Sequence, residues 1–157
     1  YLRMDYWHHR FVVHVVDVGM QDDLAYMGWR VADAAALKAM ELQLAAAGIS
    51  YRVATTAEAA ERYVLGLLKL EDPSGIPVEI FYGPRVDVHL PFHPGRRMHG
   101  RFQTGEQGLG HVLVQAKDPV ASFKFYEVLG LTGSVEYHLL YLRLSASICV
   151  YLRLSAH

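Results

Sequence analysis

The sequence of 157 residues is poor in several features that would assign a protein to a class at once. Its one cysteine, Cys149, cannot form an internal disulfide, so we expect a reducing, cytoplasmic environment. It has no apolar run of about 18 residues, so no membrane-spanning helix is expected. Its 15 Lys and Arg residues against 16 Asp and Glu residues leave a formal charge of −1, which gives no electrostatic reason to expect a nucleic-acid partner.

Signatures of several enzyme classes are missing as well: a Gly-rich phosphate loop, a nucleophile elbow and a Cys-x-x-Cys pair. The chain starts at Tyr1 in a strand-like stretch without an initiator Met or a signal peptide, from which we expect that its beginning is missing. The composition that remains, 52% hydrophobic and 20% charged residues, indicates a globular protein and argues against disorder.

Local patterns predict a mixture of strands and helices in the first part of the chain. Asp33 is a favourable N-cap, and Gly48 stands where a helix needs a left-handed residue after its end. The sequence Asp72-Pro73-Ser74-Gly75 predicts a hairpin turn, because Pro and Gly occupy positions that a β-turn favours. The predicted elements are strands 10–18, 24–32 and 51–54, helices 34–47 and 57–63, and hairpin strands 64–71 and 76–82.

Residues 83–105 interrupt this pattern with Pro and Gly and no periodicity, which indicates a linker. A strand at 110–115, an N-cap at Asp118 and a helix that Gly130 ends are predicted after it. The order of strand, Asp cap, helix and Gly stop thus occurs twice, which predicts stacked modules. We expect a boundary between residues 83 and 107, with no continuous sheet crossing it.

Five segments carry a resemblance to a known family: YLRMDYWHHR, DDLAYMGWRVA, VLGLLKLEDPSGIPVEIFYGP, PFHPGRRMHGRFQTGEQGLGH and GSVEYHL. Over about residues 1–138 the chain resembles type I extradiol ring-cleaving dioxygenases of the 2,3-dihydroxybiphenyl 1,2-dioxygenase kind, in the vicinal oxygen chelate superfamily. The resemblance implies an α+β fold of tandem βαβββ modules, present in part. It places the end of module one and all of module two in an N-terminal domain at 1–83, a linker at 84–107, and an incomplete module three, the start of the catalytic domain, at 108–157.

The family holds Fe(II) with two histidines and a glutamate, which leave positions open for substrate and dioxygen. The first histidine follows a Gly-Leu-Gly motif, and in this chain that residue is His111. From the residues alone, a lone histidine on an apolar strand is more often a hydrogen-bonded core residue. The second histidine and the glutamate would lie in module four, which the chain does not contain. His157 stands near the place of that second histidine, but its surroundings do not match the family pattern, and the glutamate has no candidate.

Two further sets of candidate residues stay open at the level of sequence. Leu113 shares a strand face with His111 and is a candidate for the wall of the substrate pocket, with a core position as the alternative. The spacing of His89, His93 and His99 suits a metal site in a loop. The resemblance places these three histidines in the linker between domains instead.

The resemblance implies an enzyme that opens a catechol ring, such as that of 2,3-dihydroxybiphenyl, beside its two hydroxyls with Fe(II) and O2, in the degradation of aromatic compounds. We expect the catechol and O2 as small-molecule partners, a homo-oligomer, and neither nucleic acid nor membrane. Since part of the metal-ligand set is missing, we expect the fragment to be incomplete for activity. The alternative is a non-catalytic binding module of the same fold, because a fold by itself does not establish a function.

Overall fold

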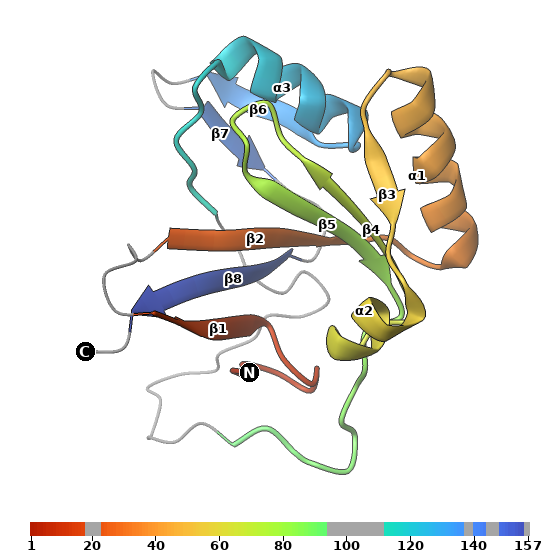
Figure 1. Ribbon diagram of the computed structural model, residues 1–157, viewed down its shortest axis with the longest axis vertical. Helices are drawn as coiled ribbons and strands as arrows, with labels where there is room; N and C mark the ends of the chain where they lie inside the picture. Colours follow the sequence, from red (N-terminus) through yellow and green to blue (C-terminus); the bar gives the residue numbers. More distant parts are fainter. Residues whose placement is uncertain (18–22, 94–111, 137–139, 144–147, 156–157) are drawn as a thin grey trace.

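The computed structural model describes residues 1–17, 23–93, 112–136, 140–143 and 148–155. These residues form strands with few helices, which confirms the α+β class (Figure 1). In chain order the elements are β1 (Phe11–Val16), β2 (Asp23–Arg30), α1 (Ala34–Ala46), β3 (Tyr51–Val53), α2 (Thr56–Glu61), β4 (Gly66–Glu71), β5 (Pro77–Tyr82), α3 (Pro119–Val128), β6 (Thr132–Glu136), β7 (Leu140–Arg143) and β8 (Ile148–Ser155).

The main sheet has the strand order β1-β8-β2-β5-β4-β3, and β6 and β7 form a separate antiparallel pair. β2 pairs with β5 in parallel, whereas β5 with β4 and β4 with β3 are antiparallel. A parallel pair needs a long connection between its strands, and α1, β3, α2 and β4 provide it. β2, α1, β3, β4 and β5 therefore follow one another in the order β-α-β-β-β, with the short helix α2 inserted before β4.

The alternation of side chains along the central strands gives the main sheet two different faces. One face packs against α1 and α3, and the other is covered in part by α2 and the N-terminal segment. The larger core, on the side of α1 and α3, consists of Met27, Trp29, Leu37, Leu44, Leu68, Leu70, Val78, Ile80, Phe125, Tyr126 and Leu131. The smaller core, on the second face, consists of Val12, Ala25, Tyr26, Ala59, Leu67 and Phe81.

The two longer helices begin at the residues that the sequence predicts and end within one residue of the predicted ends. The Asp33 side chain accepts a hydrogen bond from the backbone N–H of Ala36 at 2.8 Å, which caps α1. Gly48 follows α1 with a φ of 69°, which a residue without a Cβ adopts at little cost. In the same way, the Asp118 side chain caps α3, and Gly130, with a φ of 87°, follows its end.

The predicted turn closes the hairpin of β4 and β5. The N–H of Gly75 donates to the carbonyl oxygen of Asp72 at 2.9 Å, and Gly75 has a φ of 82°. Asp72 Oδ1 also accepts hydrogen bonds from the N–H groups of Ser74 and Ile76, at 2.8 and 2.9 Å. The Asp side chain therefore builds the turn as an Asx turn does, and the hairpin prediction is confirmed.

The predicted strand at 110–115 is not found in the part of this segment that the structure describes, which begins at residue 112. Burial still alternates there, since Val112 and Val114 pack against the larger core while Leu113 is 62% exposed. A strand also needs a neighbour for its backbone N–H and C=O groups, and no described strand pairs with residues 112–116. The side-chain pattern is therefore as predicted, whereas residues 112–115 do not form the predicted strand.

The expectation that no sheet crosses the boundary between residues 83 and 107 is wrong. β8 follows that boundary in sequence and lies between β1 and β2, parallel to β1 and antiparallel to β2 (Figure 1). β1 and β2 each present an edge whose backbone groups need partners, and β8 satisfies both edges. The division of the chain into domains around a linker at 84–107 stays a prediction.

Leu44 on α1 is fully buried against the sheet, whereas Leu42 on the same helix is 66% exposed. Leu44→Ala should lower the free energy of unfolding by about 2–5 kcal/mol, because it leaves a cavity between α1 and the sheet. Leu42→Ala should change it by less than about 0.5 kcal/mol. Urea denaturation of the two variants measures both values, and equal losses would contradict the placement of α1.

Candidate functional site

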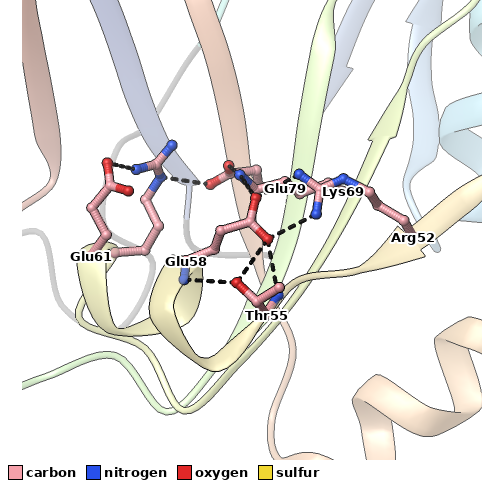
Figure 2. A network of polar contacts seen from close by, with 7 residues as sticks. Arg52, Thr55, Glu58, Glu61, Lys69 and Glu79 are labelled. Atoms are coloured by element: carbon pink, nitrogen blue, oxygen red, sulfur yellow. Dashed lines mark hydrogen bonds and ion pairs between the residues drawn. The ribbon is translucent and has the colours of Figure 1, made fainter.

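The second face of the main sheet carries a network of charged side chains (Figure 2). At its centre, Glu79 of β5 accepts a hydrogen bond from Arg62 Nε at 3.3 Å and lies 3.5 Å from Lys69 Nζ. Lys69 of β4 also donates to Glu58 at 2.9 Å, and the guanidinium of Arg52 donates to both carboxylate oxygens of Glu58, at 2.8 and 2.5 Å. The strand register sets Arg52 opposite Lys69 and Lys69 opposite Glu79, so these three residues form one row across the sheet.

Burial shifts the pKa of Glu79, and hydrogen bonding shifts the pKa of Glu58. The Glu79 side chain is 6% exposed, and burial raises the pKa of its carboxyl group although two neighbouring cations oppose the shift. Hydrogen bonds from Arg52, from the Thr55 backbone and from Lys69 hold the pKa of Glu58 well below its usual range. Both carboxylates therefore form ion pairs with arginine and lysine side chains of the chain itself.

The N-terminal segment forms an aromatic cluster next to Arg62. His8 stacks on Tyr63 with ring centroids 3.7 Å apart, and the Nδ1 atoms of His8 and His9 lie 3.0 Å apart. Such a contact needs an N–H on one ring and a lone pair on the other, so it is lost when both imidazoles are protonated. Burial, and then the charge of His8, lowers the pKa of His9 to about 4. The adjoining cavity of about 10 Å³ has room for one water molecule at most.

The predicted site residues fall mostly at the margin of the described structure. His111 and His99 lie outside the described residues, so the role of His111 as a metal ligand stays a prediction. Leu113 is described and is 62% exposed in this chain. Its role in a pocket wall stays a prediction. His89 and His93 are exposed.

Within the residues that the structure describes, no three His, Cys, Asp or Glu side chains come together in a way that could hold a metal ion. The pair formed by His8 and His9 is thus not extended into a ligand set in this part of the chain. The described residues by themselves do not fit an iron site, and no chemical step is derived from them. No helix of the described ranges is both long and apolar enough to cross a membrane.

The charged network could not be predicted from the sequence, because its members come from four different elements, β3, α2, β4 and β5. One part had a recognisable signal: the spacing of Thr55 and Glu58 is that of a capping box, which the structure shows at the start of α2. A second signal lay in the strands, where Lys69 and Glu79 are single charges within apolar runs. Charged residues at such buried positions need partners of opposite sign. Nothing local shows which residues those partners are.

Comparisons with known proteins identify close relatives, although no protein-family profile matches the chain. The chain is 61% identical over 139 residues to a biphenyl-2,3-diol 1,2-dioxygenase of Sphingomonas paucimobilis. It is 55% identical over 139 residues to a 1,2-dihydroxynaphthalene dioxygenase of Pseudomonas putida. These matches cover 88% of the chain but 46% and 45% of the two relatives. The chain therefore spans about half the length of the curated relatives it matches.

Solved structures lead to the same group of proteins. A catechol 2,3-dioxygenase matches with a TM-score of 0.81 and 56% identity, over 87% of this chain and 47% of that one. A halotolerant catechol dioxygenase matches with a TM-score of 0.69 and 36% identity, over 83% of this chain and 43% of that one. The relatives and the solved structures that the chain matches are dioxygenases named for catechol, biphenyl-2,3-diol or 1,2-dihydroxynaphthalene. Over most of its length the chain is similar to part of these proteins, which are dioxygenases of the extradiol type.

The low pKa of His9 predicts that the fold is sensitive to acid. The folded chain favours the neutral imidazole of His9. The contribution of His9 to the free energy of unfolding is therefore fully present above pH 6.5 and is lost as the pH falls from 6.5 towards 4, by up to about 3 kcal/mol. His9→Gln should remove most of this dependence, whereas the exposed control His89→Gln should retain it. Urea denaturation at a series of pH values measures the effect, and a flat profile for the unmodified chain over that range would contradict it.

Proposed function

We propose that this chain forms the N-terminal domain and the first part of the catalytic domain of an extradiol dioxygenase that cleaves biphenyl-2,3-diol or a related aromatic diol. The observation that carries the proposal is the 61% identity over 139 residues to the Sphingomonas biphenyl-2,3-diol 1,2-dioxygenase. The names of the relatives share one chemical feature, an aromatic ring with two neighbouring hydroxyl groups. Since the chain spans 46% of that relative, the activity is assigned to a longer protein that contains it.

The proposal gives the described elements places in a set of vicinal oxygen chelate modules. β1 ends the first module, and β2, α1, β3, β4 and β5 make up the second. Residues 112–130 begin the third, after a linker at 84–107. The sheet order β2-β5-β4-β3, with α1 on one face, supports the second assignment, and the capping of α3 by Asp118 and Gly130 in the manner of α1 supports the third.

The proposed cofactor is Fe(II), with His111 as the first of its protein ligands. His111 directly precedes Val112, which packs on the larger core, and stands two residues before the exposed Leu113. Leu113 is exposed on the side away from that core, where a diol and O2 would have access, and residues two apart on an extended strand share a side. The second histidine and the carboxylate of the ligand set would come from the half of the relatives that this chain does not span.

The charged face of residues 1–83, the N-terminal unit, supports the assignment of catalysis to another part of the longer protein. Glu58 and Glu79 are engaged with arginine and lysine side chains, so they do not offer free carboxylates to a metal. Binding and ring cleavage are therefore assigned to residues after the linker. The N-terminal unit supplies the rigid body against which those residues are held.

The 157-residue chain alone should not cleave biphenyl-2,3-diol at a useful rate, because part of the proposed ligand set lies outside it. Purified without oxygen and supplied with Fe(II), it should form the yellow ring-opened product at least about 100-fold more slowly than the full-length Sphingomonas relative. A chimera in which the 139 matching residues of this chain replace their counterparts in that relative should restore turnover to within about tenfold of the relative.

Turnover by the chain alone would contradict the proposed ligand set. A folded chimera that binds the diol without cleaving it would contradict the proposed activity and favour the alternative, a non-catalytic binding module.

His111→Ala in the chimera should abolish the retention of iron, because the metal loses one of its proposed ligands. The hairpin of β4 and β5 should stay folded. The matched control is His89→Ala, at an exposed position of the chain, which should retain iron as the unmodified chimera does. Iron per protein is measured by metal analysis after gel filtration, and folding by circular dichroism. Full iron content in the His111→Ala chimera would show that His111 is not a ligand.

A further inference from the structure

The turn between β4 and β5 is also the place where α3 is attached to the main sheet (Figure 1). Four polar side chains are buried at this junction, although hairpin turns usually lie at the surface of a protein. They are Asp72, Ser74, Ser122 and Tyr126.

Asp72 connects the turn to the helix with the two oxygens of one carboxylate. Oδ1 accepts the N–H groups of Ser74 and Ile76 inside the turn, and Oδ2 accepts the hydroxyl of Tyr126 on α3 at 3.1 Å. Burial, and then the charge of Asp72, raises the pKa of the Tyr126 hydroxyl, so this group remains a donor at all ordinary pH values. The geometry of the turn and the position of α3 therefore depend on the same side chain.

Ser74 makes the second connection, to the segment that leads into α3. Its Oγ accepts the backbone N–H of Lys117 at 3.0 Å and lies 3.5 Å from Oγ of Ser122. Lys117 directly precedes the N-cap Asp118, so the bond fixes the end of the segment 112–117. The start of that segment is held only by Val112 and Val114 against the larger core, without strand pairing among the described residues.

We propose that the Asp72–Gly75 turn holds the segment 112–117 in one position. Asp72, Ser74 and Tyr126 are thereby positioning residues for the ring-cleavage site. The inference rests on the proposed function, in which His111 immediately precedes this segment. Apolar contacts alone are not directional, so they would allow α3 several slightly different positions on the sheet. Directional hydrogen bonds to Asp72 and Ser74 select one of them, and a displacement of about 1 Å at a reacting group is enough to slow a reaction about 100-fold.

The first test uses the 157-residue chain and does not involve activity. Ser74→Ala should increase the rate of amide hydrogen exchange in residues 112–117 about five- to tenfold, because the bond that holds the Lys117 N–H is lost. Thr55→Ala is the matched control: it removes one hydroxyl acceptor at the start of α2, and exchange in residues 112–117 should not change. Unchanged exchange in Ser74→Ala, or an equal increase in both variants, would overturn the proposal.

The second test uses the chimera with the Sphingomonas relative. Ser74→Ala and Tyr126→Phe should each lower kcat about tenfold and change KM by less than about twofold, because the reacting groups are displaced while the surfaces that bind the diol are intact. Tyr82→Phe is the control, since Tyr82 packs against the same core and its hydroxyl makes no hydrogen bond among the described residues. It should leave both constants unchanged.

The two tests separate the inference from the function on which it rests. A folded but inactive unmodified chimera would refute the proposed function, while hydrogen exchange would still decide whether the turn holds residues 112–117. Faster exchange together with an unchanged kcat would refute the positioning role and leave the turn as a structural contact only.

Discussion

The parallel pairing of β2 with β5 is the contact on which the rest of this structure depends. It sets Met27 beside Val78 and Trp29 beside Ile80 at the centre of the larger core. Parallel neighbours cannot be joined by a tight turn, so the chain has to leave the sheet after β2 and return before β5. α1, β3, α2 and β4 form that return. α1 thereby covers one face of the sheet, and the hairpin of β4 and β5 carries its turn towards α3 (Figure 1).

The same register produces the charged row on the opposite face. Because β3, β4 and β5 are paired without a bulge, Arg52, Lys69 and Glu79 stand side by side, and α2 adds Glu58 above them (Figure 2). A buried charge that loses its partner is costly, so the buried Glu79 constrains its neighbours Arg62 and Lys69. Both carboxylates of this network, Glu58 and Glu79, are thus engaged by the protein's own cations, which fits a supporting role for residues 1–83 in the ring-cleaving enzyme we propose.

The junction of the turn with α3 links the two parts of the chain in a different way. The contact depends on a few directional hydrogen bonds and on the buried rings of Phe125 and Tyr126, since residues 112–116 pair with no described strand. The family relationship covers about half of each relative, so in the longer protein this junction would lie between a complete N-terminal unit and the start of the catalytic one. Besides β8 in the main sheet, this junction is therefore a second contact between the residues before and after the predicted linker.

Features set by neighbours within a few residues were predictable from the sequence. The caps at Asp33 and Asp118 and the turn at residues 72–75 were placed correctly because their hydrogen bonds close within four residues along the chain. The family was recognisable too, from long stretches of sequence. Three features were not predictable: the position of β8 between β1 and β2, the lack of a described strand beside residues 112–116, and the ion pairs of Glu79. Each depends on which distant segments become neighbours, and alternation or spacing along one strand specifies a face of that strand but not what packs on it.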